Sequence, residues 1–360
     1  MTDQLKHLFN FDDLEIKKIE NTTIKDRWHP VKRLLDSRAR SGRDERVIFN
    51  TDIALRHILE HHEKWLMSLK PRLLYVDDYS TPSGALGEIR AFGYLLRTGV
   101  SVNPVGKAGS DFLLSEGEEK AFVEVHSRQS NSDEAKALEN FYNKLRKKDS
   151  HGKANQGSYF LEHRTVPLGR PKIRKTKDGE TRRETITENA ISKLASIKAT
   201  EHQMSPDETS ILWLDFQDEI WDGLDTRDRV LPLRTTTPNN AFQSGELWYA
   251  FYGWKDAPIY EEFRLDMLLG PVVNMGHDGR FRQDTKLDAV IISFSGDTII
   301  LENPYSKKPI KPWLWKRLVL LHRFNFEMSY TNWPAVNLIQ RIELEEENLK
   351  KLIELSSIDL

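Results

Sequence analysis

The sequence predicts an α/β protein, with a helical N-terminal region and a mixed β-sheet core that is flanked by helices. Three observations carry this prediction. The first quarter of the chain places its apolar residues at helical spacing, and short apolar runs separated by glycine-containing turns follow from Val100. A helical stretch then leads into Ile211–Phe216, whose continuous apolarity is typical of a buried strand. The order strand, helix, strand indicates an α/β core.

The N-terminal quarter is expected to be helical. Its apolar spacing predicts helices over residues 3–20, 30–41 and 47–69. Pro71 should end the third of these, because proline lacks the backbone N–H that a helix interior needs. Ser83 can cap a further helix, which runs to about Arg97 and ends at Gly99.

The middle of the chain predicts a small meander of strands and a hairpin. The strands are expected over residues 100–105, 112–114 and 121–125, and a helix over 133–148. Asp178-Gly179 lies between a basic run at 172–177 and a second run at 180–186, which is a hairpin signal.

The remaining elements complete the core, and we find no internal repeat or low-complexity linker in them. The patterns predict a helix over 188–203, a strand over 211–216, a loop over 222–240, strands over 247–252, 289–294 and 298–301, and helices over 313–324 and 335–355.

Composition limits the chemistry. The chain has 360 residues, of which 38% are hydrophobic and 30% charged, enough for a sizeable core. It has no cysteine, so any metal must be held by oxygen or nitrogen ligands. No segment has the pattern of a signal peptide or a membrane span, so we expect a cytoplasmic protein without a membrane partner.

A net charge of −2 means that nucleic-acid binding would need local basic patches. Arg27–Arg46 is one basic stretch, for which an amphipathic helix with exposed arginines is the favoured interpretation. The hairpin near residue 178 is the other. Its candidate phosphate contacts are Lys172, Arg174, Lys175, Lys177, Arg182 and Arg183. A solvated surface hairpin is an equally good interpretation of these residues.

Acidic residues from a helix and a hairpin are expected to approach one another. Side chains alternate along a strand, so Glu124 and His126 share one face. Asp111 begins the strand that a hairpin would lay beside residues 121–125. Glu88 lies at the apolar stripe of its helix, where a carboxylate is costly unless it has a partner. Carboxylates gathered in this way can hold a divalent cation.

These residues resemble the PD-(D/E)XK nuclease superfamily, which has the restriction-endonuclease-like fold. The motif-level resemblance covers residues 83–126 and extends loosely to Phe216. Glu88 matches the helix acid, Asp111 the aspartate and Glu124 the glutamate of the family motif. His126 stands where lysine is usual.

The resemblance implies a nuclease domain over residues 76–360, after a helical region over 1–75. It implies catalytic roles for Glu88, Asp111, Glu124 and His126, and Mg²⁺ or Mn²⁺ bound by the three carboxylates and the backbone carbonyl of Val125. Lys107, Arg128 or Lys198 could replace the usual lysine, and Gln129 could orient water. Lys107, Arg128 and Gln129 are also candidate nucleic-acid contacts.

The expected function is metal-dependent hydrolysis of phosphodiester bonds in DNA, with RNA less favoured. Cleavage of a duplex would favour a homodimer or a partner nuclease. By family analogy, restriction or defence against phage is a natural setting. The alternative is a catalytically degenerate subunit with the same fold that binds nucleic acid or a protein partner, because histidine lacks the fixed charge of lysine.

Overall fold

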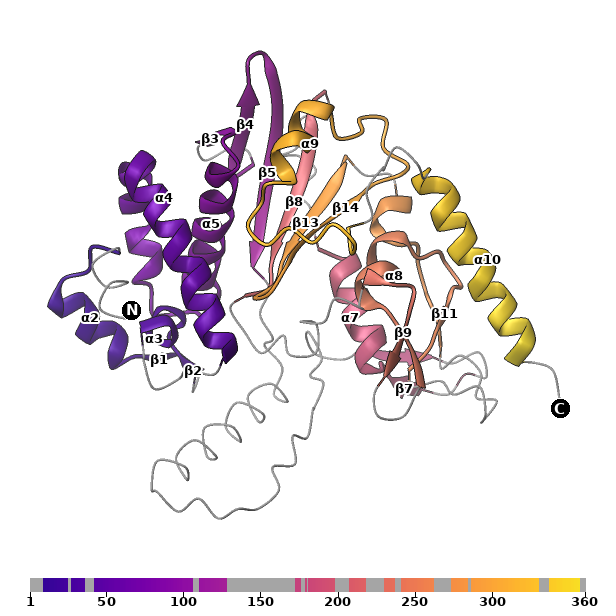
Figure 1. Ribbon diagram of the computed structural model, residues 1–360. Helices are drawn as coiled ribbons and strands as arrows, with labels where there is room; N and C mark the ends of the chain where they lie inside the picture. Colours follow the sequence, from indigo (N-terminus) through magenta and orange to yellow (C-terminus); the bar gives the residue numbers. More distant parts are fainter. Residues whose placement is uncertain are drawn as a thin grey trace.

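A computed structural model shows a layered α/β architecture, in which one mixed sheet separates two groups of helices (Figure 1). The structure describes residues 9–24, 27–35, 42–105, 110–127, 172–175, 179, 181–197, 207–217, 230–236, 241–261, 273–283, 286–329 and 337–356. The predicted α/β class, with a mixed sheet flanked by helices, is confirmed.

The central sheet has six strands in the order β14-β13-β8-β5-β4-β3. Its strands are β3 (Ser101–Pro104), β4 (Phe112–Glu116), β5 (Glu119–Ser127), β8 (Thr209–Asp215), β13 (Ala289–Ser293) and β14 (Thr298–Glu302). The first three form the predicted antiparallel meander. β8 lies parallel to both β5 and β13, and β14 returns antiparallel to β13. The strands predicted in these six places are confirmed.

Helices cover both faces of the sheet (Figure 1). They are α2 (Asp13–Glu20), α3 (Pro30–Leu35), α4 (Gly42–Leu73), α5 (Ser80–Arg97), α7 (Ile186–Ala195), α8 (Glu246–Tyr252), α9 (Pro312–Leu318) and α10 (Leu338–Ser356). Short antiparallel pairs join β1 (Thr23–Ile24) to β2 (Arg27–Trp28), β6 (Ile173–Lys175) to β7 (Thr181–Arg183), β9 (Leu233–Thr236) to β10 (Ala241–Ser244), and β11 (Pro258–Ile259) to β12 (Val273–Asn274). Arg280–Arg282 form a single 3₁₀ turn.

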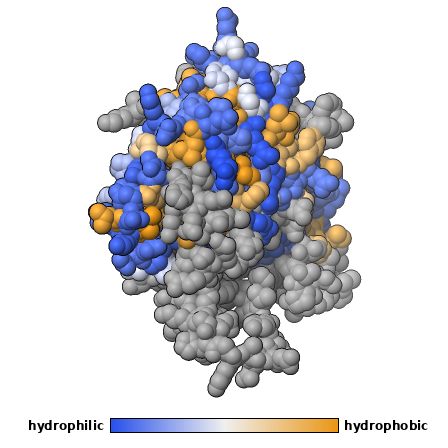
Figure 2. Space-filling model, turned by 60° about the vertical axis from the view of Figure 1, so that its left-hand side comes forward, coloured by the Kyte–Doolittle hydropathy of each residue, from blue (hydrophilic) through white to orange (hydrophobic). Residues whose placement is uncertain are grey.

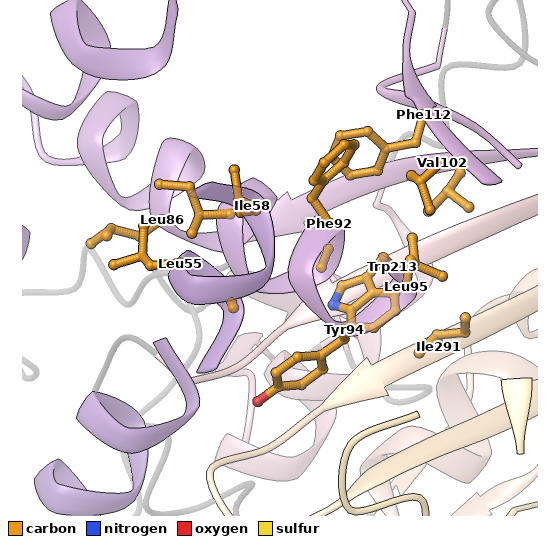
Figure 3. Packing of buried hydrophobic residues seen from close by; sticks show 14 of the residues in the cluster. Leu55, Ile58, Leu86, Phe92, Tyr94, Leu95, Val102, Phe112, Trp213 and Ile291 are labelled. Atoms are coloured by element: carbon orange, nitrogen blue, oxygen red, sulfur yellow. The ribbon is translucent and has the colours of Figure 1, made fainter. Parts of the chain in front are cut away.

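Two hydrophobic cores lie on opposite faces of the sheet. On the first face, side chains of α4 and α5 pack against Val123 of β5 and Trp213 of β8. Figure 3 shows Trp213 beside Tyr94 and Leu95 of α5. On the second face, side chains of α7, α8 and α10 pack against Leu212 and Leu214 of the same strand β8. Alternation along β8 therefore assigns odd-numbered residues to the first core and even-numbered residues to the second.

Several N-terminal boundaries differ from prediction. Within the described residues, the helix predicted over 3–20 is α2, which begins at Asp13 because Asp12 caps it and accepts from the backbone N–H groups of Leu14 and Glu15. Helix α4 begins at Gly42, five residues before its predicted start. Pro71 does not end α4, which bends at His62 and continues to the buried Leu73. Proline there costs the helix one hydrogen bond near its end, where apolar burial offsets the loss.

Helix α5 begins at Ser80, four residues earlier than a cap at Ser83 predicts. Its first turn is capped by Asp78, whose carboxylate accepts from the backbone N–H of Thr81, and Ser83 lies buried inside the helix. Gly99, with φ of 76°, follows the end of the helix as predicted.

The largest error of sequence interpretation is α8, for which a strand was predicted. All residues of Glu246–Tyr252 are buried, and the six that follow Glu246 are apolar or aromatic, so no polar face shows a helical period. A continuous apolar run of this length does not distinguish a strand from a buried helix. Part of the predicted loop over 222–240 is also wrong, since Leu233–Thr236 pairs as β9 with β10.

The other helices are shorter than predicted. The segment expected over 188–203 is α7, capped by Thr185 and ending at Ala195. The helix expected over 313–324 ends at Leu318, and α10 begins at Leu338. The helix predicted over 133–148 lies outside the described residues.

Helices α4 and α5 approach closely at Gly93, where an added Cβ would lie 2.3 Å from the Cα of Ala54. Gly93→Ala should therefore push the helices apart and lower the free energy of unfolding by about 1–3 kcal/mol. Urea unfolding measures this change. Gly276→Ala is the control, because an added Cβ there meets no atom within 4 Å; equal stabilities of the two variants would contradict the prediction.

The surface of the described residues is mixed. Figure 2 shows hydrophobic side chains in separate groups among hydrophilic ones, and Leu14 is the most exposed large hydrophobic residue at 77%. Among the described residues, no helix combines the length and apolarity needed to cross a membrane.

Candidate functional site

The candidate site lies at the carboxyl end of β5, where β4 begins. The antiparallel register pairs Phe112 with Val123, so its continuation by one residue sets Asp111 opposite Glu124. The sequence-predicted juxtaposition of these two acids follows from that register. The strand β5 runs beyond this point to Ser127, held on its other side by β8.

Asp111 is held against the backbone of β5. Its Oδ2 accepts a hydrogen bond of 2.7 Å from the backbone N–H of Val125. Burial, together with the nearby charge of Glu88, raises the pKa of Asp111 to about 7, although the Val125 bond and Arg72 act in the opposite direction. The environment therefore stabilises the negative charge of Asp111 less than water does.

Glu124 and His126 lie on the sheet face that α5 does not cover. Val123 packs in the core beneath α5, whereas Glu124 is paired with Leu212, which belongs to the opposite core. The carboxylate of Glu124 is 12% exposed, and its Oε1 lies 3.7 Å from Nε2 of His126. The two side chains are therefore neighbours, as predicted from the alternation.

Glu88 reaches the site from α5 and is engaged by an arginine. Nη1 and Nη2 of Arg72, in the last turn of α4, each donate a hydrogen bond of 2.7 Å to one oxygen of Glu88. The Glu88 side chain is 13% exposed and that of Arg72 is 41% exposed. Such a bidentate pair fixes the orientation of the guanidinium relative to the carboxylate.

Behind the site, a buried ion pair joins α5 to β8. Nε and Nη2 of Arg90 donate to the two oxygens of Asp215 at 3.2 and 2.5 Å, and both side chains are fully buried. Asp215 also accepts from Ser293 of β13 at 3.0 Å. Gly87 permits this close approach, because an added Cβ would lie 3.3 Å from Cβ of Asp215 and 1.9 Å from Oγ of Ser127. The pair thus positions α5, and with it Glu88.

The donor set suits a small divalent cation with few protein ligands. Among the described residues, no group of three or more His, Asp or Glu side chains is arranged to hold a metal. Asp111 and Glu124, which the strand register sets opposite one another, remain as candidate ligands, and Mg²⁺ commonly binds one or two carboxylates while keeping its waters. The N–H of Val125 points toward Asp111, so its carbonyl points to the same side of the strand. A cation there would stabilise the charge of Asp111.

The basic hairpin uses part of its charge internally. Arg174 donates to Glu184 at 2.7 and 3.1 Å, and Arg182 donates to Glu188 at 2.8 and 3.2 Å. Both acids belong to the start of α7 or the residues before it, so these two arginines hold the hairpin to the helix. Lys172 and Arg183 are exposed.

The structure does not describe every residue that was predicted for the site. Lys107, Arg128, Gln129, Lys177 and Lys198 lie outside the described residues, and for Lys175 only the backbone is described. Arg72 and the Arg90–Asp215 pair were missed from the sequence. The signal for Arg72 was the expected need of a partly buried Glu88 for a partner, although no local spacing identifies that partner across 16 residues.

Comparison of the chain with protein-family models, with curated proteins and with solved structures gave no match.

Proposed function

We propose that this chain is a metal-dependent nuclease that hydrolyses phosphodiester bonds, with DNA favoured over RNA. The observation that carries the proposal is the placement of Asp111 opposite Glu124 at the carboxyl end of β5. The scaffold around them is a helix, an antiparallel three-stranded meander and a parallel fourth strand. This order supports a restriction-endonuclease-like core, in line with the resemblance of the motif residues to the PD-(D/E)XK superfamily.

Asp111, Glu124 and the carbonyl of Val125 would hold Mg²⁺ or Mn²⁺. When bound, such an ion lowers the pKa of a water and stabilises charge on the phosphate. The side chain of His126, which lies beside Glu124, is 27% exposed and would serve as the base that takes a proton from the attacking water. Val125 orients Asp111 through its N–H.

The test compares the wild type with Asp111→Ala and Glu124→Ala on plasmid DNA and on RNA, with Mg²⁺ or Mn²⁺. We expect cleavage by the wild type and a loss of more than about 100-fold in each variant, since removal of an outer-shell partner alone costs about 10–100-fold. Glu119→Ala is the matched control, because this acid of β5 is 46% exposed and pairs with Lys311.

Equal cleavage by the wild type and both site variants would contradict the assignment of Asp111 and Glu124. Loss of activity in the Glu119 control as well would show that the assay reports stability rather than chemistry.

A catalytically degenerate subunit is the second candidate. Two observations favour it: His126 replaces the usual lysine, and Glu88 is already neutralised by Arg72. Such a subunit would bind nucleic acid or a protein partner without cleaving. Nucleic-acid binding by the wild type, with no cleavage under either metal, would select this function.

A further inference from the structure

The ion pair between Arg72 and Glu88 places a guanidinium at the proposed site, and the inference below rests on the proposed function. Glu88 supplies an acceptor oxygen to each of two nitrogens of Arg72. The charges of Glu88 and Asp111 raise the pKa of Arg72, although desolvation by burial, the largest single influence, lowers it. Arg72 is therefore a permanent cation close to Asp111.

The geometry also leaves hydrogen-bonding capacity on Arg72. A guanidinium has five N–H donors in a planar fork. Among the described residues, the side-chain hydrogen bonds of Arg72 are the two to Glu88, and 41% of its side chain is exposed to solvent. Donors that face outward can reach a phosphate while the inner two stay on Glu88.

Glu88 is poorly placed to act as a metal ligand beside Glu124. Both of its oxygens accept hydrogen bonds from Arg72, so a metal bound by Glu88 would have to displace the guanidinium. Removing Arg72 from Glu88 would leave a partly buried carboxylate without its cation, which is costly.

We propose that Arg72 binds the scissile phosphate and supplies the positive charge that His126 does not carry permanently, and that Glu88 is a positioning residue for Arg72. In this arrangement the metal is held by Asp111 and Glu124, and the cation comes from the N-terminal helix α4 rather than from β5.

Two measurements test the proposal without depending on turnover. The first is binding of a short DNA duplex in Ca²⁺, at several salt concentrations, by the wild type, Arg72→Ala and Arg72→Lys. The second is direct Mn²⁺ titration of the wild type, Glu88→Gln and Asp111→Asn without DNA. Arg56→Ala is the matched control, because Arg56 is also on α4, pairs with Asp52 and is 53% exposed.

We expect Arg72→Ala to weaken duplex binding about tenfold or more and to lower the slope of log affinity against log salt by about one, as for loss of a charged phosphate contact. The duplex affinity of Arg72→Lys should lie between those of the wild type and Arg72→Ala, since lysine keeps the positive charge but loses the planar, bidentate donor geometry of arginine. Mn²⁺ affinity should fall in Asp111→Asn and stay within about twofold of wild type in Glu88→Gln, and Arg56→Ala should match the wild type.

Duplex binding by Arg72→Ala equal to that of the wild type would overturn the proposal, and so would a fall of tenfold or more in Mn²⁺ affinity of Glu88→Gln. If Arg72→Ala does not fold, Arg72→Lys decides: duplex binding as tight as that of the wild type would overturn the proposal, because the bidentate contact would then contribute nothing. Failure of the proposed function can be told apart from failure of this proposal. If the wild type neither binds Mn²⁺ nor cleaves DNA, both the nuclease function and the role of Arg72 are wrong. If the wild type cleaves DNA and Arg72→Ala cleaves it equally well, only the role of Arg72 is wrong.

Discussion

Replacing Asp215 by alanine is expected to lower the free energy of unfolding by about 3–5 kcal/mol, the usual cost of leaving one partner of a buried ion pair without its counter-charge. Arg90 and Asp215 are both fully buried, and the carboxylate also accepts from Ser293. The variant would remove the carboxylate to which Nε and Nη2 of the buried Arg90 donate. Urea unfolding measures the change, and the slope of the free energy of unfolding against urea concentration is compared between the variants.

The control is the double variant Arg90→Met with Asp215→Leu, which removes both charges and fills similar volume. Exchanging a whole buried pair for apolar side chains is often neutral or stabilising, so the double variant should be more stable than Asp215→Ala. A loss below about 1 kcal/mol in the single variant would contradict the energetic role assigned to this pair.

Asp111→Asn is expected to stabilise the protein at alkaline pH and, under the proposed function, to abolish cleavage. Burial and the charge of Glu88 raise the pKa of Asp111 from 3.8 to about 7. Between these values the folded protein binds a proton that the unfolded chain has released, so the contribution of Asp111 to stability is present below pH 4 and is lost as the pH rises to about 7. Asparagine carries no charge to bury and can still accept from Val125.

The measurement is the difference in the free energy of unfolding between the wild type and Asp111→Asn from pH 4 to pH 8. It should be small at pH 4 and grow to a few kcal/mol in favour of the variant at pH 8. Mn²⁺ should raise the melting temperature of the wild type at pH 8 and leave that of the variant unchanged. A difference that does not vary with pH would show that Asp111 is not destabilised by its surroundings.

The strands around the site could be predicted because their patterns are local. Runs such as Ala121–Val125, bounded by turn residues, are short and apolar, and the register that sets Asp111 opposite Glu124 follows from one tight hairpin. Alternation alone then placed Glu124 and His126 on one face. These features depend on residues close together in the sequence.

The contacts that complete the site depend on residues far apart. Arg72 and Glu88 meet because α4 folds back on α5, and Asp215 meets Arg90 across 125 residues. The sequence spacing of these residues does not predict either ion pair. The strand predicted at Leu247–Tyr252 was wrong for a related reason: complete burial removes the polar residues whose period distinguishes helix from strand.

The strand β8 has a consequence for how the molecule unfolds. Its side chains alternate between the two cores, with Trp213 in one and the flanking Leu212 and Leu214 in the other. Loss of this strand would open both layers at once, and loss of either layer would leave one side of the strand exposed to water. The described layers therefore form one cooperative unit rather than two that can melt in turn.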